Sequence, residues 1–471
     1  MSYKVELFHS LLNDFLQGES ALITIEGEVL AVRGKHPATY GTLSTAANIV
    51  GKYLKLQEGD IAVLNDPYSG GSTLDEMTFI MAVSEDLLWI TRRPMTKSIK
   101  TGKSIEDEGL RIPPTPLLQN GKVNEVILSA MQAHPACPTD LGGATFADWI
   151  KAHFAEMILH AQKLHDTIEA TGFEITGELI EEYVELSKNL AHQRISENAS
   201  GETRVDIVLD SGELLRLNLE IHEGKIKMDF GGTSAAKTIH LTESAAFGTC
   251  FHTISRYYGF TEYANSGTFS ALQVTKPAGC WLMAKYPAST LKGMTSGVAA
   301  LQAAIELALT HIHTKREKAM SCYSPLTVQL QNGASHIVVN LQGGKGALAS
   351  KDGDSAQVEN LSIEMIEREL PLRVIRADRR QSSGGKGKYS GGRGLIFKVE
   401  ALEDIEATWL SDLTLHRPRI TKNCSHGDPC EISLDSQGTN KVLPVLGTQK
   451  ILKGDILTLC SGSGGGFGKA E

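Results

Sequence analysis

Residues 56–80 read LQEGDIAVLNDPYSGGSTLDEMTFI, a stretch that predicts a buried strand, a tight polar turn and a second strand. The apolar run at 61–64 is continuous, which is typical of a strand covered on both faces. The Asn-Asp-Pro sequence at 65–67 ends that strand, because proline donates no backbone hydrogen bond and Asn and Asp close turns through their side chains. The glycines at 70–71 then permit close backbone approach. A loop rich in carboxylates and hydroxyls after a buried strand is a common place for a reaction site, although an ordinary solvated turn has the same local pattern.

The composition is that of a soluble globular chain with several domains. The chain has 471 residues, of which 41% are hydrophobic and 21% charged, so two or three domains are expected. A net charge of −9 argues against general nucleic-acid binding. No run of about 18 apolar residues occurs and the first residues lack a signal-peptide core, so we expect no membrane span and a cytoplasmic location.

The seven cysteines are scattered and odd in number, which favours reduced thiols over a disulfide framework. The tightest cluster is Cys424, His426 and Cys430, which together offer three potential metal ligands. The cluster lacks paired Cys-x-x-Cys spacing, and a loop with two incidental thiols is the alternative.

The order of expected elements predicts an α+β fold with several mixed or antiparallel sheets, flanking helices and a β-rich C-terminal lobe. Three domains are expected, at 1–200 with the NDPYSGG loop, at 201–350 with a β-meander and helices, and at 351–471 with the β-rich lobe. The patterns behind this division are a hairpin at 20–33, helices at 42–54, 147–170, 176–192, 242–258 and 296–313, a meander at 204–230, and short strands with glycine-rich turns to the C-terminus.

Seven motifs along the chain resemble those of the hydantoinase B/oxoprolinase family, which includes B-type subunits of hydantoin- and lactam-opening enzymes and a related acetone carboxylase subunit. None is decisive alone, but together they run collinearly over about 400 residues. They are GD-x4-NDPYSGG at 59–71, EGLRIPP at 108–114, DFGGTS at 229–234, NSG with a later P-x-G at 265–279, E-x2-E-x-E-x-PLRV at 364–374, SSGGKGKYSGGRG at 382–394, and GD with GGGFG at 454–468.

The resemblance implies a two-subunit chemistry. A hydantoinase A-like ATP-binding subunit phosphorylates a small cyclic amide or ketone, and the B-type subunit then directs water or a carboxyl species onto the activated intermediate. ATP would therefore reach this chain only through its partner, in a homo- or hetero-oligomer. The resemblance also implies one divalent metal ion in the B-type subunit, which would polarise the activated carbonyl and acidify bound water.

The chain departs from the family pattern where the resemblance places the metal ligands. The family stretch GGTHLPD reads GGSTLDE here, so Thr73 stands at the histidine and Glu76 at the aspartate. The HHxD stretch corresponds to about 94–97 and contains Lys97 but no histidine, with Arg92 and Arg93 just before it. Glu19 is the residue that can substitute in the first hairpin. The expected metal ligands therefore reduce to Glu76 and Glu19, which suit a weakly held divalent ion such as Mg²⁺ better than Zn²⁺.

Two hypotheses follow for the activity. In the first, the chain is an active hydrolase subunit, with Glu76 or Asp66 as general base and Arg92, Arg93 or Lys97 supplying positive charge. In the second, the chain is a non-catalytic paralogue that serves as a structural or regulatory partner, which the loss of histidines favours.

Two weaker alternatives remain open. His134 in MQAHPACPTD is a candidate replacement ligand or a plain loop histidine. The basic segment at 91–103 is a candidate anion site of a stand-alone binding protein, or a solvated loop. The substrate is not predicted by any of these patterns.

Overall fold

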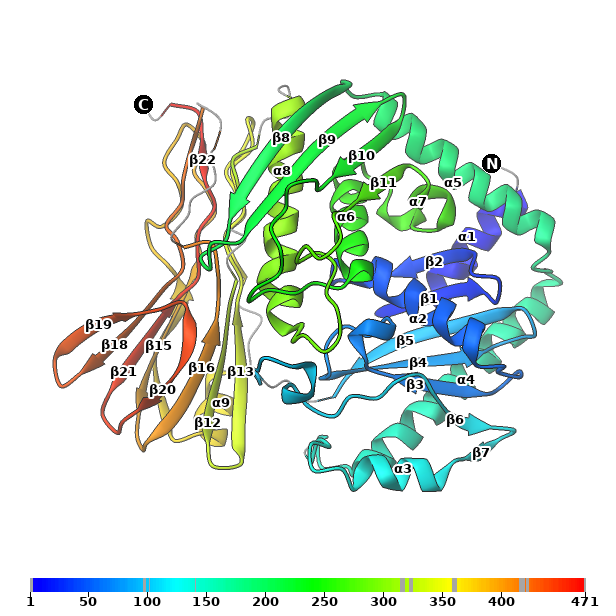
Figure 1. Ribbon diagram of the computed structural model, residues 1–471, viewed down its shortest axis with the longest axis horizontal. Helices are drawn as coiled ribbons and strands as arrows, with labels where there is room; N and C mark the ends of the chain where they lie inside the picture. The colour runs from blue at the N-terminus through cyan, green and yellow to red at the C-terminus, as the bar shows by residue number, and fades with distance from the viewer. Residues whose placement is uncertain are drawn as a thin grey trace.

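The computed structural model describes residues 3–95, 99–100, 102–139, 141–313, 318–321, 325–357, 362–414, 420 and 423–469. In this part of the chain, helices and antiparallel or mixed sheets confirm the predicted α+β fold (Figure 1). The first sheet has seven antiparallel strands in the order β2-β1-β5-β4-β3-β6-β7. Their bounds are β1 (Glu19–Thr24), β2 (Val29–Arg33), β3 (Ile61–Leu64), β4 (Glu76–Ala82), β5 (Leu87–Pro94), β6 (Thr115–Gln119) and β7 (Lys122–Val123).

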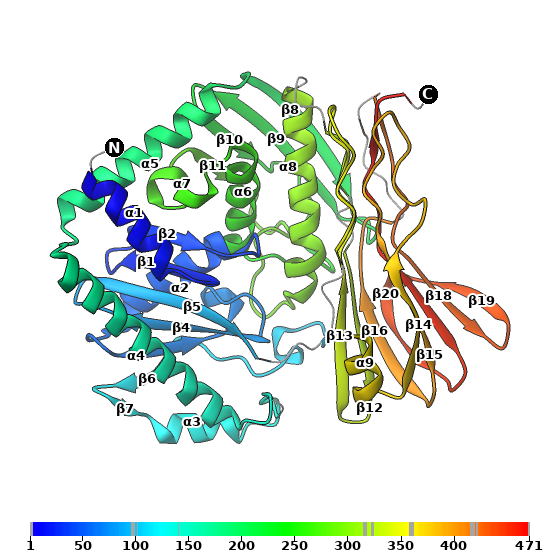
Figure 2. The same ribbon diagram turned by 180° about the vertical axis from the view of Figure 1, so that it is seen from behind.

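This N-terminal sheet is covered on both faces, which explains the unbroken apolar run of β3. All four β3 residues are buried. Side chains alternate between faces along each strand, so Ile80 and Ile90 pack with α2 (Thr39–Tyr53), while Phe79 and Trp89 pack on the other face. Figure 2 shows α1 (Tyr3–Phe15) and α4 (Phe146–Thr171) lying across this second face.

The central part contains the predicted meander and several buried helices. Its sheet has the order β11-β10-β9-β8, and β11 adds to β10 in parallel after the chain has passed through two helices. One hydrophobic cluster contains residues of this sheet, its helices and the α2 face of the N-terminal sheet. The elements are α5 (Gly177–Ser196), β8 (Gly201–Val208), β9 (Leu214–His222), β10 (Lys225–Asp229), α6 (Glu243–Tyr258), α7 (Ser266–Phe269), β11 (Leu272–Thr275), the π-helical segment η4 (Gly293–Gly297) and α8 (Val298–Ile312).

A close helix contact joins the first two parts. Helix α2 packs on α6 at Gly41 and Gly248. A Cβ atom on Gly41 would lie 2.0 Å from the carbonyl oxygen of Ser244, so no larger residue fits without moving a backbone. This contact fixes where the N-terminus of α2 sits against the central helices. The predicted domain boundaries at residues 200 and 350 stay predictions.

The C-terminal lobe contains two larger antiparallel sheets that share one core, and a two-stranded sheet formed by residues 424–425 and 466–467. The orders of the two larger sheets are β13-β12-β16-β20 and β14-β15-β21-β18-β19, and residues of both contribute to one hydrophobic cluster. Figure 1 shows these strands as a layer beside α8 and β8, away from α4. The bounds are β12 (Leu326–Asn332), β13 (Ser335–Leu341), α9 (Ile363–Glu369), β14 (Leu372–Arg379), β15 (Leu395–Ala401), β16 (Ile405–Leu410), β17 (Cys424–Ser425), β18 (Glu431–Ser436), β19 (Thr439–Leu443), β20 (Leu446–Ile451), β21 (Ile456–Cys460) and β22 (Gly466–Phe467).

Candidate functional site

Strand register brings three of the predicted site residues to one end of the N-terminal sheet. Glu19 of β1 lies opposite Arg92 of β5, and Arg92 lies opposite Thr78 of β4. Glu76 is two residues before Thr78, on the same face of the sheet because side chains alternate. This is the face that α2 covers, since Arg92 donates hydrogen bonds to Thr42 of that helix. We refer to Glu19, His36, Glu76 and Arg92 as the Arg92 cluster.

Arg92 is a buried cation that is held entirely by neutral acceptors. The residue is only 3% exposed. Nε donates to Thr78 Oγ1 at 3.1 Å, Nη1 and Nη2 donate to Thr42 Oγ1 at 3.1 and 3.2 Å, and Nη2 donates to the carbonyl of Gly70 at 3.0 Å. Burial lowers the pKa of Arg92, while the carboxylates of Glu76 and Glu19 act to raise it. The guanidinium therefore lies within electrostatic reach of both glutamates.

The two glutamates of the cluster accept hydrogen bonds from the loops around them. Glu19 Oε1 accepts the backbone N–H groups of Lys35 at 2.7 Å and of His36 at 3.1 Å, and Glu19 Oε2 accepts the hydroxyl of Thr39. Glu76 Oε2 accepts the hydroxyl of Ser72. Glu19 thus holds the loop that leads into α2, and Glu76 closes the polar turn after β3.

His36 is a member of the cluster that the sequence patterns did not identify. Nδ1 accepts the backbone N–H of Ala38 at 3.3 Å. His36 is an exposed residue, and the protein around its ring still desolvates it. This desolvation lowers the pKa of His36, with Glu76 and Glu19 opposing the effect and Arg92 adding to it. The only sequence signal was a histidine between Gly34 and Pro37, directly after a hairpin.

His36 lines a cavity of about 430 Å³ between the three parts of the molecule. Its walls come from the loop before α2, from α6, from η4 and α8, and from the loop after β13. The charged residues of the wall are Arg256, Glu306, Lys318 and Lys345. Lys318 pairs with Glu306 at 2.8 Å and Lys345 pairs with Asp354 at 3.7 Å. Three cations and one carboxylate line this wall, and Asp354 lies beside it, so the wall carries a small excess of positive charge.

A second histidine lies on α6, one turn before Arg256 of the cavity wall. His252 of α6 is 5% exposed, and its ring lies against Tyr40 with the ring centroids 5.1 Å apart. Burial, helped by the charges of Arg256 and His36, lowers the pKa of His252 to about 4. The imidazole is therefore neutral in the folded protein at pH 7.

Asp66 is used to build the turn of the NDPYSGG motif. It is 3% exposed, and its carboxylate accepts the N–H of Tyr68 at 3.2 Å and the hydroxyl of Ser69 at 2.8 Å. Arg111 lies 3.5 Å from the same carboxylate. Asn65 holds the loop further, since its amide donates to the carbonyls of Leu74 and Leu110. The NDPYSGG and EGLRIPP motifs therefore pack on each other, and the assignment of Asp66 as a base stays a prediction.

Glu108 is a buried carboxylate that the sequence patterns also missed. It is 6% exposed, and Oε1 accepts the hydroxyl of Ser289 and the N–H groups of Thr290 at 2.8 Å and Leu291 at 3.0 Å. Oε2 is buried without a hydrogen-bond partner among the residues described. Burial raises the pKa of Glu108. This carboxylate ties the EGLRIPP motif to the segment that begins the helical run of η4 and α8.

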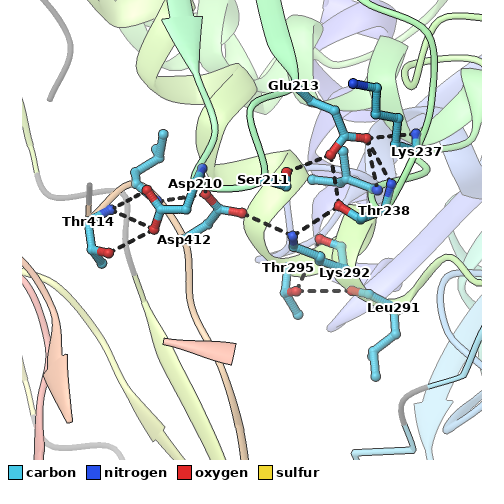
Figure 3. A network of polar contacts seen from close by, with 12 residues as sticks. Asp210, Ser211, Glu213, Lys237, Thr238, Leu291, Lys292, Thr295, Asp412 and Thr414 are labelled. Atoms are coloured by element: carbon cyan, nitrogen blue, oxygen red, sulfur yellow. Dashed lines mark hydrogen bonds and ion pairs between the residues drawn. The ribbon is translucent and has the colours of Figure 1, made fainter. Parts of the chain in front are cut away.

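The start of that helical run is also joined to the C-terminal lobe by a network of polar contacts (Figure 3). Glu213 accepts the hydroxyl of Thr238 at 2.8 Å, and Thr238 accepts Lys292 Nζ at 3.4 Å. Lys292 Nζ lies 3.3 Å from Asp412, and Asp412 accepts the N–H of Asp210 at 2.7 Å. This network attaches the C-terminal lobe to the central part of the molecule. The loop after β13 in that lobe forms one wall of the cavity.

The other predicted site residues lie elsewhere or outside the described chain. Lys97 is outside the described residues. Arg93 lies on the opposite face of the sheet from Arg92, where it pairs with Glu156 of α4 at 2.8 Å. His134 is exposed and accepts the N–H of Ala136 at 3.1 Å.

The donor set does not fit the divalent metal ion that the family resemblance implies. Across the described ranges, no three His, Cys, Asp or Glu side chains are placed to hold a metal ion, and this includes Cys424, His426 and Cys430. Glu19 and Glu76 accept hydrogen bonds from neighbouring loops. A fixed guanidinium charge lies beside them, and it would repel a second cation.

No helix in the described chain has the length and hydropathy of a membrane span.

Comparison with known proteins places the chain among the following relatives. An uncharacterised protein of Methanocaldococcus jannaschii is 26% identical over 97% of this chain and 85% of its own length. A putative B-type subunit of a D-/L-hydantoinase from Pseudomonas sp. (strain NS671) is 23% identical over 87% of this chain and 76% of its own length. The chain spans about two fifths of the length of the 5-oxoprolinases that it matches, 39% in the case of the Arabidopsis thaliana protein.

A solved structure shares the fold over almost the whole chain. The ATP-dependent caprolactamase from Pseudomonas jessenii superimposes with a TM-score of 0.79 at 17% identity, covering 96% of this chain and 84% of the other. The profile of the Hydantoinase B/oxoprolinase family matches residues 11–470. The chain therefore belongs to the hydantoinase B/oxoprolinase family.

Proposed function

We propose that this chain is the B-type subunit of an ATP-dependent system that opens a small cyclic amide, such as a hydantoin, an oxoproline or a lactam, or that carboxylates a related substrate. An ATP-binding partner of the hydantoinase A type activates the substrate, and this chain receives the activated, anionic form in the cavity lined by His36. Family membership and the names of the relatives support the class of system.

The observation that carries the proposal is the position of Glu76. Its carboxylate lies at the end of the sheet face that α2 covers, and it acts on the pKa of His36, which lines the 430 Å³ cavity. Glu76 is not itself among the residues that line the cavity, and it would take the proton of an attacking water through one bridging water molecule. Glu76 suits this role better than Asp66, because the Asp66 carboxylate is 3% exposed and lies 3.5 Å from the cation of Arg111, whereas the Glu76 carboxylate accepts the neutral hydroxyl of Ser72.

In the proposed mechanism, this chain's own residues orient the activated substrate and accept a proton from water. The cavity orients the activated substrate, with its cationic wall neutralising the anionic group. Glu76 accepts the proton of the water that attacks the activated carbonyl carbon. The ring C–N bond then breaks, the proton passes to the ring nitrogen, and hydrolysis of the resulting acyl phosphate by a second water releases phosphate and the free acid. His36 stays neutral at pH 7 because its pKa is lowered, so it contributes a hydrogen-bonding wall without adding charge.

One experiment tests this proposal and also distinguishes an active enzyme from a non-catalytic paralogue, the alternative that the altered metal-ligand positions favour. The chain is isolated with its partner from the source cells, and ATP-dependent consumption of hydantoin, 5-oxoproline and caprolactam is measured. We expect E76Q to lower kcat by about 100-fold or more, while E85Q, in the exposed turn between β4 and β5, keeps the wild-type rate.

An E76Q complex with unchanged kcat would refute the role of Glu76. A folded complex that forms but consumes none of these substrates with ATP would support a regulatory or structural role instead. The cytoplasmic location stays a prediction.

A further inference from the structure

We propose that the chain carries a second ligand pocket, which takes a neutral, mainly apolar molecule with a single carbonyl acceptor. The pocket has a volume of about 480 Å³, and its lining comes from both the C-terminal lobe and the central part of the molecule. Among the described residues it shares no lining residue with the cavity lined by His36. The inference therefore goes beyond the proposed function.

The apolar part of the lining comes from the C-terminal lobe. Ile432 lies in β18, Leu443 ends β19 and Leu446 begins β20, so this wall forms where the chain passes from the edge of one sheet to the edge of the other. Leu446 is 44% exposed, whereas Ile432 and Leu443 are buried, so the apolar surface continues from solvent into the lobe. An apolar wall with a few polar groups, at a boundary between two parts of a molecule, is typical of a small-molecule site.

The polar part of the lining includes Lys292 and Asp412 (Figure 3). Lys292 Nζ lies 3.3 Å from Asp412 and 3.4 Å from Thr238 Oγ1, and these are its acceptors within the described ranges. An ammonium group has three N–H donors. Because both contacts are long and the Lys292 side chain keeps 15% of its surface exposed, one donor remains for an oxygen atom of the ligand.

The charges of the lining favour a neutral ligand. Lys292 and Asp412 are an ion pair, so neither group needs a charge from the ligand. A carboxylate of the ligand would meet Asp210 and Asp412, and an ammonium group would meet Lys292. Burying either charge costs free energy, whereas a carbonyl oxygen accepts from Lys292 without bringing a charge into the pocket.

The volume sets the size of the apolar body. A dry apolar cavity of about 150 Å³ holds one benzene molecule. About 480 Å³ is therefore enough for a body of two fused rings.

The test measures the binding of four matched naphthalene probes to the full chain by fluorescence titration. The probes are 2-acetylnaphthalene, 2-ethylnaphthalene, 2-naphthoate and 2-naphthylmethylamine, which share the ring body and differ in the group that they offer to Lys292. Wild type is expected to bind one 2-acetylnaphthalene per chain, about 10-fold more tightly than each of the other three probes. K292M is expected to bind the acetyl and ethyl probes equally well.

A second variant fills the pocket. L446W is expected to weaken the binding of 2-acetylnaphthalene by about 10-fold or more, because the larger side chain occupies the space of the ligand. L452W is the matched control, since Leu452 is 48% exposed and is not among the lining residues, and it should keep the wild-type affinity. Circular dichroism and gel filtration establish that each variant is folded.

Two results would overturn the inference. One is a wild-type protein that binds none of the probes, or that binds the carboxylate or the amine most tightly; this comparison needs no variant and remains decisive where a variant fails to fold. The other is equal affinity of folded L446W and L452W for 2-acetylnaphthalene. Neither measurement needs substrate, ATP or partner, so failure here is distinct from failure of the proposed function.

Discussion

Acidification is expected to destabilise this protein through His252, the buried histidine of α6. The folded structure holds this ring neutral, with a pKa of about 4 caused mainly by burial and in smaller part by the charges of Arg256 and His36. In the unfolded chain the same ring has a pKa near 6.5. The unfolded state therefore binds the proton first as the pH falls.

The sign and the size of the effect follow from this difference in pKa. The stability is fully present above about pH 6.5, where both states are neutral, and it is lost as the pH falls from about 6.5 through about 4. The full difference corresponds to about 3 kcal/mol once the pH lies below both pKa values. Between pH 7 and pH 4.5 we expect a loss of about 2 kcal/mol from this residue.

The assay compares wild type with H252L, in which nothing titrates at this position. Denaturant unfolding at pH 7 and at pH 4.5 should show a loss of stability on acidification that is about 2 kcal/mol smaller in H252L than in wild type. H222L is the matched control, because it makes the same substitution at a histidine whose side chain is 69% exposed. In parallel, NMR of histidine-labelled protein should show a resonance, absent from H252L, that titrates near pH 4.

A His252 resonance that titrates near 6.5 would refute the reasoning, because it would mean that the folded ring is as easily protonated as a free one. Equal acid profiles of wild type and H252L would refute it as well. Either result would also mean that the folded protein does not hold the buried imidazole of His252 in its neutral form.

Two further predictions concern the motifs that hold the cavity in place. G71A is expected to destabilise the protein by about 2 kcal/mol or more, because a Cβ atom there would lie 2.1 Å from the carbonyl oxygen of Asn65. G177A is the control, since its Cβ atom meets nothing within 4 Å; equal denaturation midpoints for the two variants would contradict the steric account. E108A is expected to cost about 3 kcal/mol because it leaves three buried or partly buried donors without their acceptor, whereas E108Q keeps an acceptor oxygen and should cost about 1 kcal/mol or less. Thermal unfolding measures both, and an E108Q as unstable as E108A would show that the charge itself is needed.

The sequence alone determined the elements around the first turn and the family. The continuous apolar run at 61–64 indicated a strand covered on both faces, and all four residues are buried. The Asn-Asp-Pro sequence predicted the turn that Asp66 closes on Tyr68 and Ser69. These features depend on residues a few positions apart, so local pattern is sufficient to predict them.

Only the tertiary structure decided which charged residues share the site. Arg92 and Arg93 are equivalent in the sequence, yet strand register turns Arg92 toward Glu19 and Glu76 and turns Arg93 toward Glu156. A shift of one residue in register would exchange the two faces, and nothing local to the arginines specifies it. Contacts with distant segments, such as Glu108 with residues 289–291, form for the same reason only after the sheet and the central helices have packed together.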